Sequence, residues 1–257
     1  MAVLVLGRPV VRTGGVSRHP ARRMARILLG VLALRANRAL PLEWIVEALW
    51  PGRPPTSAAA NVRNHVADLR RLLREAGPGQ PGIVTSRDGY VLVTPPDGVD
   101  VTLFQRLLVE GHELRGRGGD FAAAGCLARA VGLWRGPVMA GVPVPEAVRP
   151  DVTVLDEQRL GAIEDLVGVR LALGLHDGLV PALAGLVVEH PLRERLWRHL
   201  VAALAAAGRR TEAVAVYRRL VEVLDSELGV TPSAATTALY ESVRRNEPAA
   251  PELGGQN

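Results

Sequence analysis

The sequence has 257 residues and a formal net charge of +5, a length that allows one large domain or two ordinary ones with buried cores. Four Trp, three Tyr and two Phe leave Leu, Val and Ala to fill those cores, which favours helices over a sandwich or barrel. A single cysteine, Cys126, excludes an internal disulfide framework and a cysteine-based metal cluster, and no apolar run has the length of a signal peptide or a bilayer span.

The positive charge is concentrated in the N-terminal third of the chain. Residues 1–96 contain 14 Arg and five acidic residues, whereas residues 97–257 contain 17 Arg and 21 acidic residues. This asymmetry indicates one module that binds a polyanion and a second module with another task. Since no continuous basic amphipathic helix with an aromatic face is present, nucleic acid is a better partner than a membrane surface.

The first elements are short. Residues 3–12 are expected to form short strands broken by Gly and Pro, and residues 13–20 a loop. An apolar stripe at helical spacing predicts a helix over residues 22–36. A second helix is expected from Pro41 in its first turn to the Trp-Pro-Gly stop that begins at Trp50.

Residues 57–75 are predicted to form a basic amphipathic helix, which Thr56 or Ser57 could cap. The residues spaced for its buried stripe are Val62, Val66, Leu69 and Leu73. The opposite face carries the candidate base-contacting residues Asn64, Asp68 and Arg71. One flank carries the candidate phosphate-contacting residues Arg63, Arg70 and Arg74. Alternatively, the basic face is only the solvated side of an ordinary amphipathic helix. His65, at the edge of this face, is expected to be a surface residue.

Residues 83–94 are predicted to form a β-hairpin around Asp88-Gly89, with Arg87 at its tip. Three helices, the third basic, followed by such a hairpin are typical of a winged helix-turn-helix, whose third helix enters the major groove of DNA. The predicted fold is therefore mostly α, with a winged helix-turn-helix domain over residues 1–96 that includes short N-terminal strands.

Beyond the Pro-Pro-Asp-Gly segment at residues 95–98, the sequence predicts an all-α domain over residues 97–246. Its helices follow in pairs, and two glycine turns 34 residues apart suggest tetratricopeptide-like hairpins. The longest helix is expected over residues 152–173, and residues 247–257 are expected to be a disordered tail.

No catalytic, metal or cofactor motif stands out. The chain has no phosphate-binding P-loop, and its six histidines lack zinc-ligand spacing. The carboxylates on the helix predicted over 152–173 are expected to be solvated or paired with arginine rather than catalytic, namely Asp156, Glu157, Glu164 and Asp165. We therefore expect no enzyme activity and no cofactor.

The order of these elements resembles the small Streptomyces antibiotic regulatory proteins, in which an OmpR-type winged helix is joined to a bacterial transcriptional activation domain. The motifs that support the resemblance in the first half are ANR at 36–38, EALWP at 47–51, AANV at 59–62, LRRL at 69–72 and DGYVL at 88–92. Those in the second half are LWRG at 133–136, EQR at 157–159, HPLRE at 190–194, AVAVYR at 213–218 and ELGV at 227–230. One departure is Asp68, where members of this family usually carry arginine.

The resemblance implies an activator of a secondary-metabolite gene cluster. Because no apolar run is long enough for a signal peptide or a membrane span, the protein is expected to be cytoplasmic and nucleoid-associated. The resemblance also implies binding to direct repeats near the −35 region of promoters, with two protomers in tandem, and contact with the RNA polymerase holoenzyme, including its sigma factor. The competing hypothesis is a helical-repeat scaffold for protein partners that carries a basic N-terminal domain incidentally.

Overall fold

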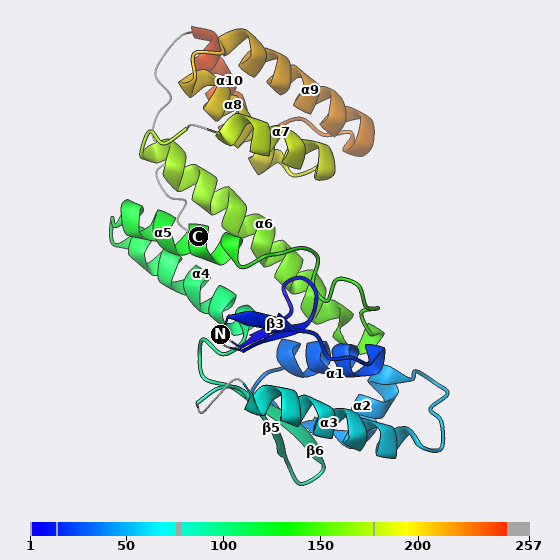
Figure 1. Cartoon of the computed structure of the whole chain (residues 1–257). Helices are drawn as coiled ribbons and strands as arrows, with labels where there is room; N and C mark the ends of the chain where they lie inside the picture. Colours follow the sequence, from blue (N-terminus) through cyan, green and yellow to red (C-terminus); the bar gives the residue numbers. More distant parts are fainter. Residues whose placement is uncertain (1, 14, 76–78, 177, 246–257) are drawn as a thin grey trace. The chain divides into compact units, whose positions relative to one another are not determined.

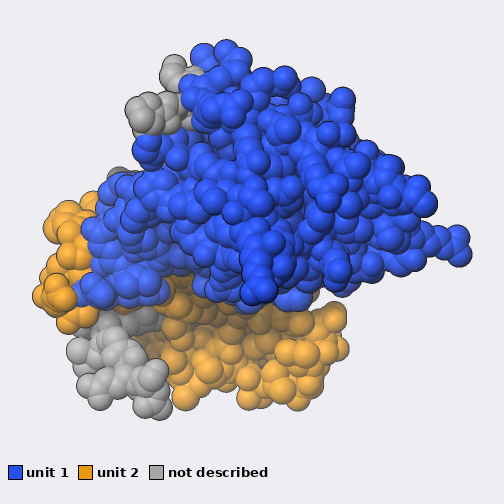
Figure 2. All heavy atoms as spheres, turned by 90° about the horizontal axis from the view of Figure 1, so that it is seen from below, with its two compact units in different colours: residues 1–113, 125–160 blue, residues 114–124, 161–257 orange. Residues whose placement is uncertain are grey.

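The computed structural model describes residues 2–13, 15–75, 79–176 and 178–245. The chain forms two compact units, one of residues 1–113 and 125–160 and the other of residues 114–124 and 161–257 (Figure 2). The expected tail over 247–257 lies outside the described residues. Among the described helices, none is both long enough and apolar enough to cross a membrane.

The first unit begins with a small antiparallel sheet. Strand β1 (Val3–Leu4) pairs with β2 (Val10–Thr13), which pairs with β3 (Val16–Arg18). The prediction of a loop over residues 13–20 is wrong, because β3 lies within it. All three residues of β3 are exposed, so this strand has no alternation of buried and exposed side chains that a sequence pattern could reveal.

Three helices follow, as predicted: α1 (Arg23–Leu34), α2 (Leu42–Leu49) and α3 (Ala58–Arg74), seen in blue to cyan in Figure 1. The expected side-chain cap of α3 is absent. Ser57 occupies the N-cap position without a capping hydrogen bond, and its hydroxyl accepts one from the Asn61 amide at 3.2 Å. The carbonyl of Pro55 accepts the Ala58 N–H instead, at 2.8 Å.

The predicted hairpin is present as β5 (Gly82–Thr85) and β6 (Gly89–Val93), and β6 also pairs with the short strand β4 (Leu40–Pro41). A Cβ at Gly89 would lie 1.9 Å from the carbonyl oxygen of Leu40, so only glycine allows this approach. The turn carbonyl of Asp88 accepts the Leu42 N–H at the start of α2, at 2.8 Å.

Asn37 holds the other end of the hairpin. Its backbone has a φ of +63°, a left-handed conformation that asparagine tolerates better than most residues. From there its N–H donates to the Leu92 carbonyl, and its side-chain oxygen accepts the Thr94 N–H, both at 2.9 Å. The hairpin is therefore bonded at both ends to the segment between α1 and α2.

The rest of the described chain is helical. Helices α4 (Asp100–Gly116) and α5 (Asp120–Gly132) are followed by the 3₁₀ turn η1 (Glu146–Val148) and α6 (Arg149–Ala172). The second unit then contains α7 (Leu179–Glu189), α8 (Glu194–Ala206), α9 (Arg210–Leu228) and α10 (Ala234–Arg245). The helical domain was predicted, and α6 matches the long helix expected over residues 152–173.

The core of the second unit brings together residues of the two helices that follow the glycine turns. Leu179 and Leu183 on α7 and Ala213 and Tyr217 on α9 are all buried in one hydrophobic cluster. Tyr217 also stacks on Tyr240 of α10, with ring centroids 3.9 Å apart. Ala213 and Tyr217 have the small-then-aromatic step of a tetratricopeptide helix hairpin, and stacked helix pairs are the architecture of such arrays.

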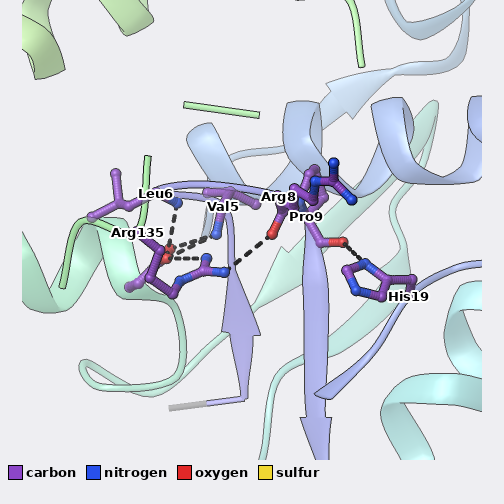
Figure 3. Close-up of polar contacts among 7 residues, drawn as sticks. Val5, Leu6, Arg8, Pro9, His19 and Arg135 are labelled. Atoms are coloured by element: carbon purple, nitrogen blue, oxygen red, sulfur yellow. Dashed lines mark hydrogen bonds and ion pairs between the residues drawn. The ribbon is translucent and has the colours of Figure 1, made fainter. Parts of the chain in front are cut away.

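A buried carboxylate connects α4 to the segment between β1 and β2 within the first unit. Asp100 accepts the Val5 N–H at 2.8 and 2.9 Å and the Leu6 N–H at 2.9 Å. Arg135 approaches the same carboxylate at 3.3 Å and donates to the Arg8 carbonyl at 3.3 Å (Figure 3). Burial raises the pKa of the Asp100 carboxyl, while these hydrogen bonds and the Arg135 charge oppose the rise.

We expect Gly89→Ala to lower the free energy of unfolding by about 2 kcal/mol or more, because the added methyl group would overlap the Leu40 carbonyl. The matched control is Gly82→Ala in β5, where an added Cβ meets no atom within 4 Å. Urea unfolding of both variants measures the difference. Equal stabilities would contradict the close approach of β4 and β6.

Candidate nucleic-acid interface

Helix α3 has one buried face and one exposed face. The apolar residues predicted to face the core are all buried, namely Val62, Val66, Leu69 and Leu73. They pack toward α1, α2 and β5. Helical periodicity therefore leaves the opposite face and one flank of α3 to solvent.

The exposed face of α3 carries the residues that we predicted to contact bases. Asn64 is exposed, and Arg71 retains 72% of its side-chain exposure. Asp68 is half-buried, and its carboxylate accepts a hydrogen bond from Arg71 at 3.1 Å. An exposed pair at this spacing contributes about 0.2–0.5 kcal/mol. In the protein alone, the partner of Asp68 is thus Arg71.

The flank with Arg63, Arg70 and Arg74 is not uniform. Arg63 and Arg74 are exposed, whereas Arg70 is half-buried against the hairpin. Arg70 Nε donates to the Ile83 carbonyl at 2.8 Å and Nη2 donates to the Thr85 hydroxyl at 2.7 Å. Its guanidinium also lies 5.8 Å from the ring centroid of Tyr90. These contacts fix the hairpin against α3.

The hairpin presents Arg87 at its turn, where the side chain is exposed. The turn is closed by a hydrogen bond from the Ser86 N–H to the Gly89 carbonyl at 2.9 Å. Both the exposed face of α3 and this cation therefore belong to elements that hydrogen bonds hold in a fixed arrangement, in one compact unit. Such an arrangement can present cations and amide groups to a polyanion together.

The expectation that His65 is a surface residue is wrong. Its side chain is 7% exposed, and its Nδ1 has no hydrogen-bond partner among the described residues. Burial, and after it the charge of Arg22, lower the pKa of His65 below its usual 6.5, while Asp68 acts in the opposite direction. Helical position alone misplaced this residue, because it lies at the edge of the buried stripe.

Sequence reasoning also missed the contacts that fix α3. Neither the Arg70 contacts nor the ion pair of 2.8 Å between Arg18 and Glu75 at the end of α3 was foreseen. Residues in these pairs are 13 to 57 positions apart, and local periodicity contains no signal for them.

The carboxylates of α6 were predicted correctly as arginine partners in two cases. Glu164 lies near Arg195, and Asp165 forms an ion pair with Arg195 at 2.5 Å.

Comparison with known proteins identifies both halves of the chain. Residues 21–92 match the family model described as "Transcriptional regulatory protein, C terminal", and residues 99–244 match the one described as "Bacterial transcriptional activator domain". The regulatory protein DnrI of Streptomyces peucetius is 33% identical over 96% of this chain and 93% of its own length. The chain belongs to the Streptomyces antibiotic regulatory protein family. Its relatives are transcriptional regulators, not enzymes.

Other relatives of this family member are longer. The regulatory protein AfsR of Streptomyces griseus is 36% identical over 86% of this chain, which spans 22% of AfsR. The transcriptional regulatory protein EmbR of Mycobacterium tuberculosis is 31% identical over 87% of this chain and 58% of EmbR. A structure of EmbR in complex with a low affinity phosphopeptide superposes with a TM-score of 0.87 at 28% identity, covering 97% of this chain and 66% of that one.

The buried His65 predicts acid sensitivity of the fold. Because its pKa is lowered in the folded state, the unfolded chain binds a proton more readily, so stability is lost as the pH falls below about 6.5. We expect His65→Gln to reduce this loss between pH 7 and pH 5 in urea unfolding. A loss of stability in His65→Gln equal to that of the unchanged protein would exclude His65 as the cause.

Proposed function

We propose that this regulator is a sequence-specific DNA-binding transcription activator of a secondary-metabolite gene cluster. The observation that supports it best is the exposed face of α3, with its amide, carboxylate and guanidinium groups, bonded through Arg70 to a hairpin that ends in Arg87. A helix of this size fits the major groove of B-DNA, and a hairpin beside it can contact the backbone or the minor groove.

The proposed contacts divide into two classes. Asn64, Asp68 and Arg71 would contact base edges, because amide and guanidinium groups form two hydrogen bonds to adenine and guanine, respectively, and a carboxylate can accept from cytosine N4. The Asp68–Arg71 pair orients both side chains before DNA binds.

The phosphate contacts would come from Arg63 and Arg74 on α3 and from Arg87 on the hairpin, with Arg70 on the same flank. Two nitrogens of Arg70 already donate to β5, so its contact to phosphate would also hold the hairpin in position. Phosphate contacts of this kind position the protein and supply affinity that depends on salt.

We further propose a functional division of the chain. Residues 1–96 would bind DNA, and residues 97–246 would form the activation domain, in line with the matches of the two family models to residues 21–92 and 99–244. The operator would consist of direct repeats near the −35 region, bound by two protomers in tandem. The activation domain would contact the RNA polymerase holoenzyme, including its sigma factor.

Footprinting of the full chain on promoters next to its own gene tests this proposal. Protection of two repeats in the same orientation is expected, together with activated transcription by purified RNA polymerase holoenzyme. Insertion of about five base pairs between the repeats rotates one site by half a helical turn and should abolish cooperative binding. Salt-reversible binding without a protected site would instead support a protein-binding scaffold.

Asn64→Ala is expected to relax the preference at one base position of the operator by about 1–3 kcal/mol, because an asparagine side chain distinguishes adenine in the major groove. Binding to operators with each base substituted in turn measures the effect. Affinity for random DNA should change little, and an equal loss on operator and random DNA would exclude a role in base recognition.

Arg74→Ala is expected to weaken binding to all DNA sequences. It should also reduce the magnitude of the slope of log K against log salt concentration by about one. The control is Arg219→Ala on α9, which removes the same charge from an exposed arginine paired with Glu222. Titrations at several salt concentrations compare the two slopes. A slope of Arg74→Ala that equals that of the control would rule out the phosphate contact.

A further inference from the structure

A cavity of about 230 Å³ that opens to solvent lies in the first unit, and none of the residues assigned to DNA lines it. It is lined by Arg8 and Pro9 before β2, by His19 and Arg26 around the start of α1, and by Ala140, Gly141 and Val142 in the segment between α5 and η1. Its volume is below the range of about 300–1,000 Å³ that is usual for drug-sized ligands, so it suits a compact molecule.

The ionisable lining of this cavity is entirely basic. Arg8, His19 and Arg26 are its ionisable residues, and none of the seven lining residues is acidic. Cations that share one cavity repel each other, and an anion placed among them relieves that repulsion. Two guanidinium groups also match the geometry of phosphate oxygens, to which arginine can donate two hydrogen bonds at once.

Hydrogen bonds fix the side chains of His19 and Arg26 and the backbone at Arg8. Arg26 Nη1 donates to the Pro20 carbonyl at 3.2 Å. His19 Nδ1 lies 3.3 Å from the Pro9 carbonyl, so this ring nitrogen is the one that donates, and Arg135 donates to the Arg8 carbonyl at 3.3 Å (Figure 3). Binding to a site arranged in advance costs less ordering entropy.

The remaining wall is formed by a backbone segment without a charged side chain. Gly141 has a φ of +82°, and a Cβ there would lie 3.6 Å from Arg8 Nε, so the guanidinium of Arg8 lies close to this glycine. Val142 and Pro9 add apolar surface. A lining that combines cations with small apolar groups suits a molecule that has both a phosphate and a small organic part.

We propose that this cavity binds a compact phosphate-bearing small molecule. Arg26 belongs to the segment matched by the first family model, and Ala140 to Val142 belong to the segment matched by the second. A ligand in this cavity therefore contacts both segments at once. Because it binds the folded chain, its binding free energy adds to the stability of their packing within the first unit.

The test is calorimetric titration of the full chain, without DNA, with inorganic phosphate and with ribose 5-phosphate at constant ionic strength. Saturable binding is expected, tighter for ribose 5-phosphate, because its sugar carbons add van der Waals contact with Pro9 and Val142. Arg8→Gln should weaken the affinity about tenfold, since it removes a charge-assisted hydrogen bond. The matched control is Arg12→Gln on β2, an exposed arginine outside the cavity lining, and it should change the affinity less than twofold.

Two results would overturn the proposal. The first is no saturable binding of either phosphate compound, and the second is an equal affinity in the Arg8→Gln and Arg12→Gln proteins. A promoter fragment titrated into both variants identifies the alternative occupant. If Arg8→Gln weakens DNA binding while phosphate compounds do not bind, the cavity contacts the DNA backbone and the small-molecule site is excluded. Because the titration is done without DNA, its failure leaves the proposed function untouched.

Discussion

The buried carboxylate of Asp100 is the constraint on which the first unit depends. A carboxylate removed from water is costly unless hydrogen bonds compensate it, and Asp100 receives them from the N–H groups of Val5 and Leu6. The carbonyls of the same two residues accept hydrogen bonds from the segment after α5, from Arg135 N–H to Leu6 at 2.8 Å and from Met139 N–H to Val5 at 2.9 Å. Loss of the carboxylate would leave those donors without their partner in the interior.

This arrangement explains why the compact units differ from the division that composition and the family models suggest. Residues 125–160 fold with the winged helix, although they lie in the segment matched by the activation-domain model. Arg35 at the end of α1 makes a second contact between the first part of the chain and residues 125–160. Its guanidinium forms an ion pair with Asp151 of α6 at 3.1 Å and lies 4.5 Å from the ring centroid of Trp44. Part of the segment matched by the activation-domain model thus folds in the same compact unit as α3.

The elements that sequence predicted well are those with a strong local signal. The stripe of Val62, Val66, Leu69 and Leu73 follows the helical period, and Asp88-Gly89 marks the hairpin turn, so α3 and the wing were both located within a few residues. In contrast, β3 and β4 are too short or too exposed to show a period, and their pairing is decided by tertiary contacts. The environments of His65 and Arg70 depend on neighbours far away in the chain, and no local rule contains that information. The seven candidate DNA-contacting residues stay predictions.

The turn of the hairpin also has a consequence for how this protein would adapt to DNA. The Asp88 carbonyl receives the first N–H of α2, and β6 lies against β4 so closely that Gly89 has no room for a side chain. The wing is therefore an extension of the helix-turn-helix framework and not a hinged arm. Under the proposed function, a rigid reader of this kind leaves the bending and the change in groove width to the duplex. Base steps that no side chain touches then enter recognition through the energy needed to deform them.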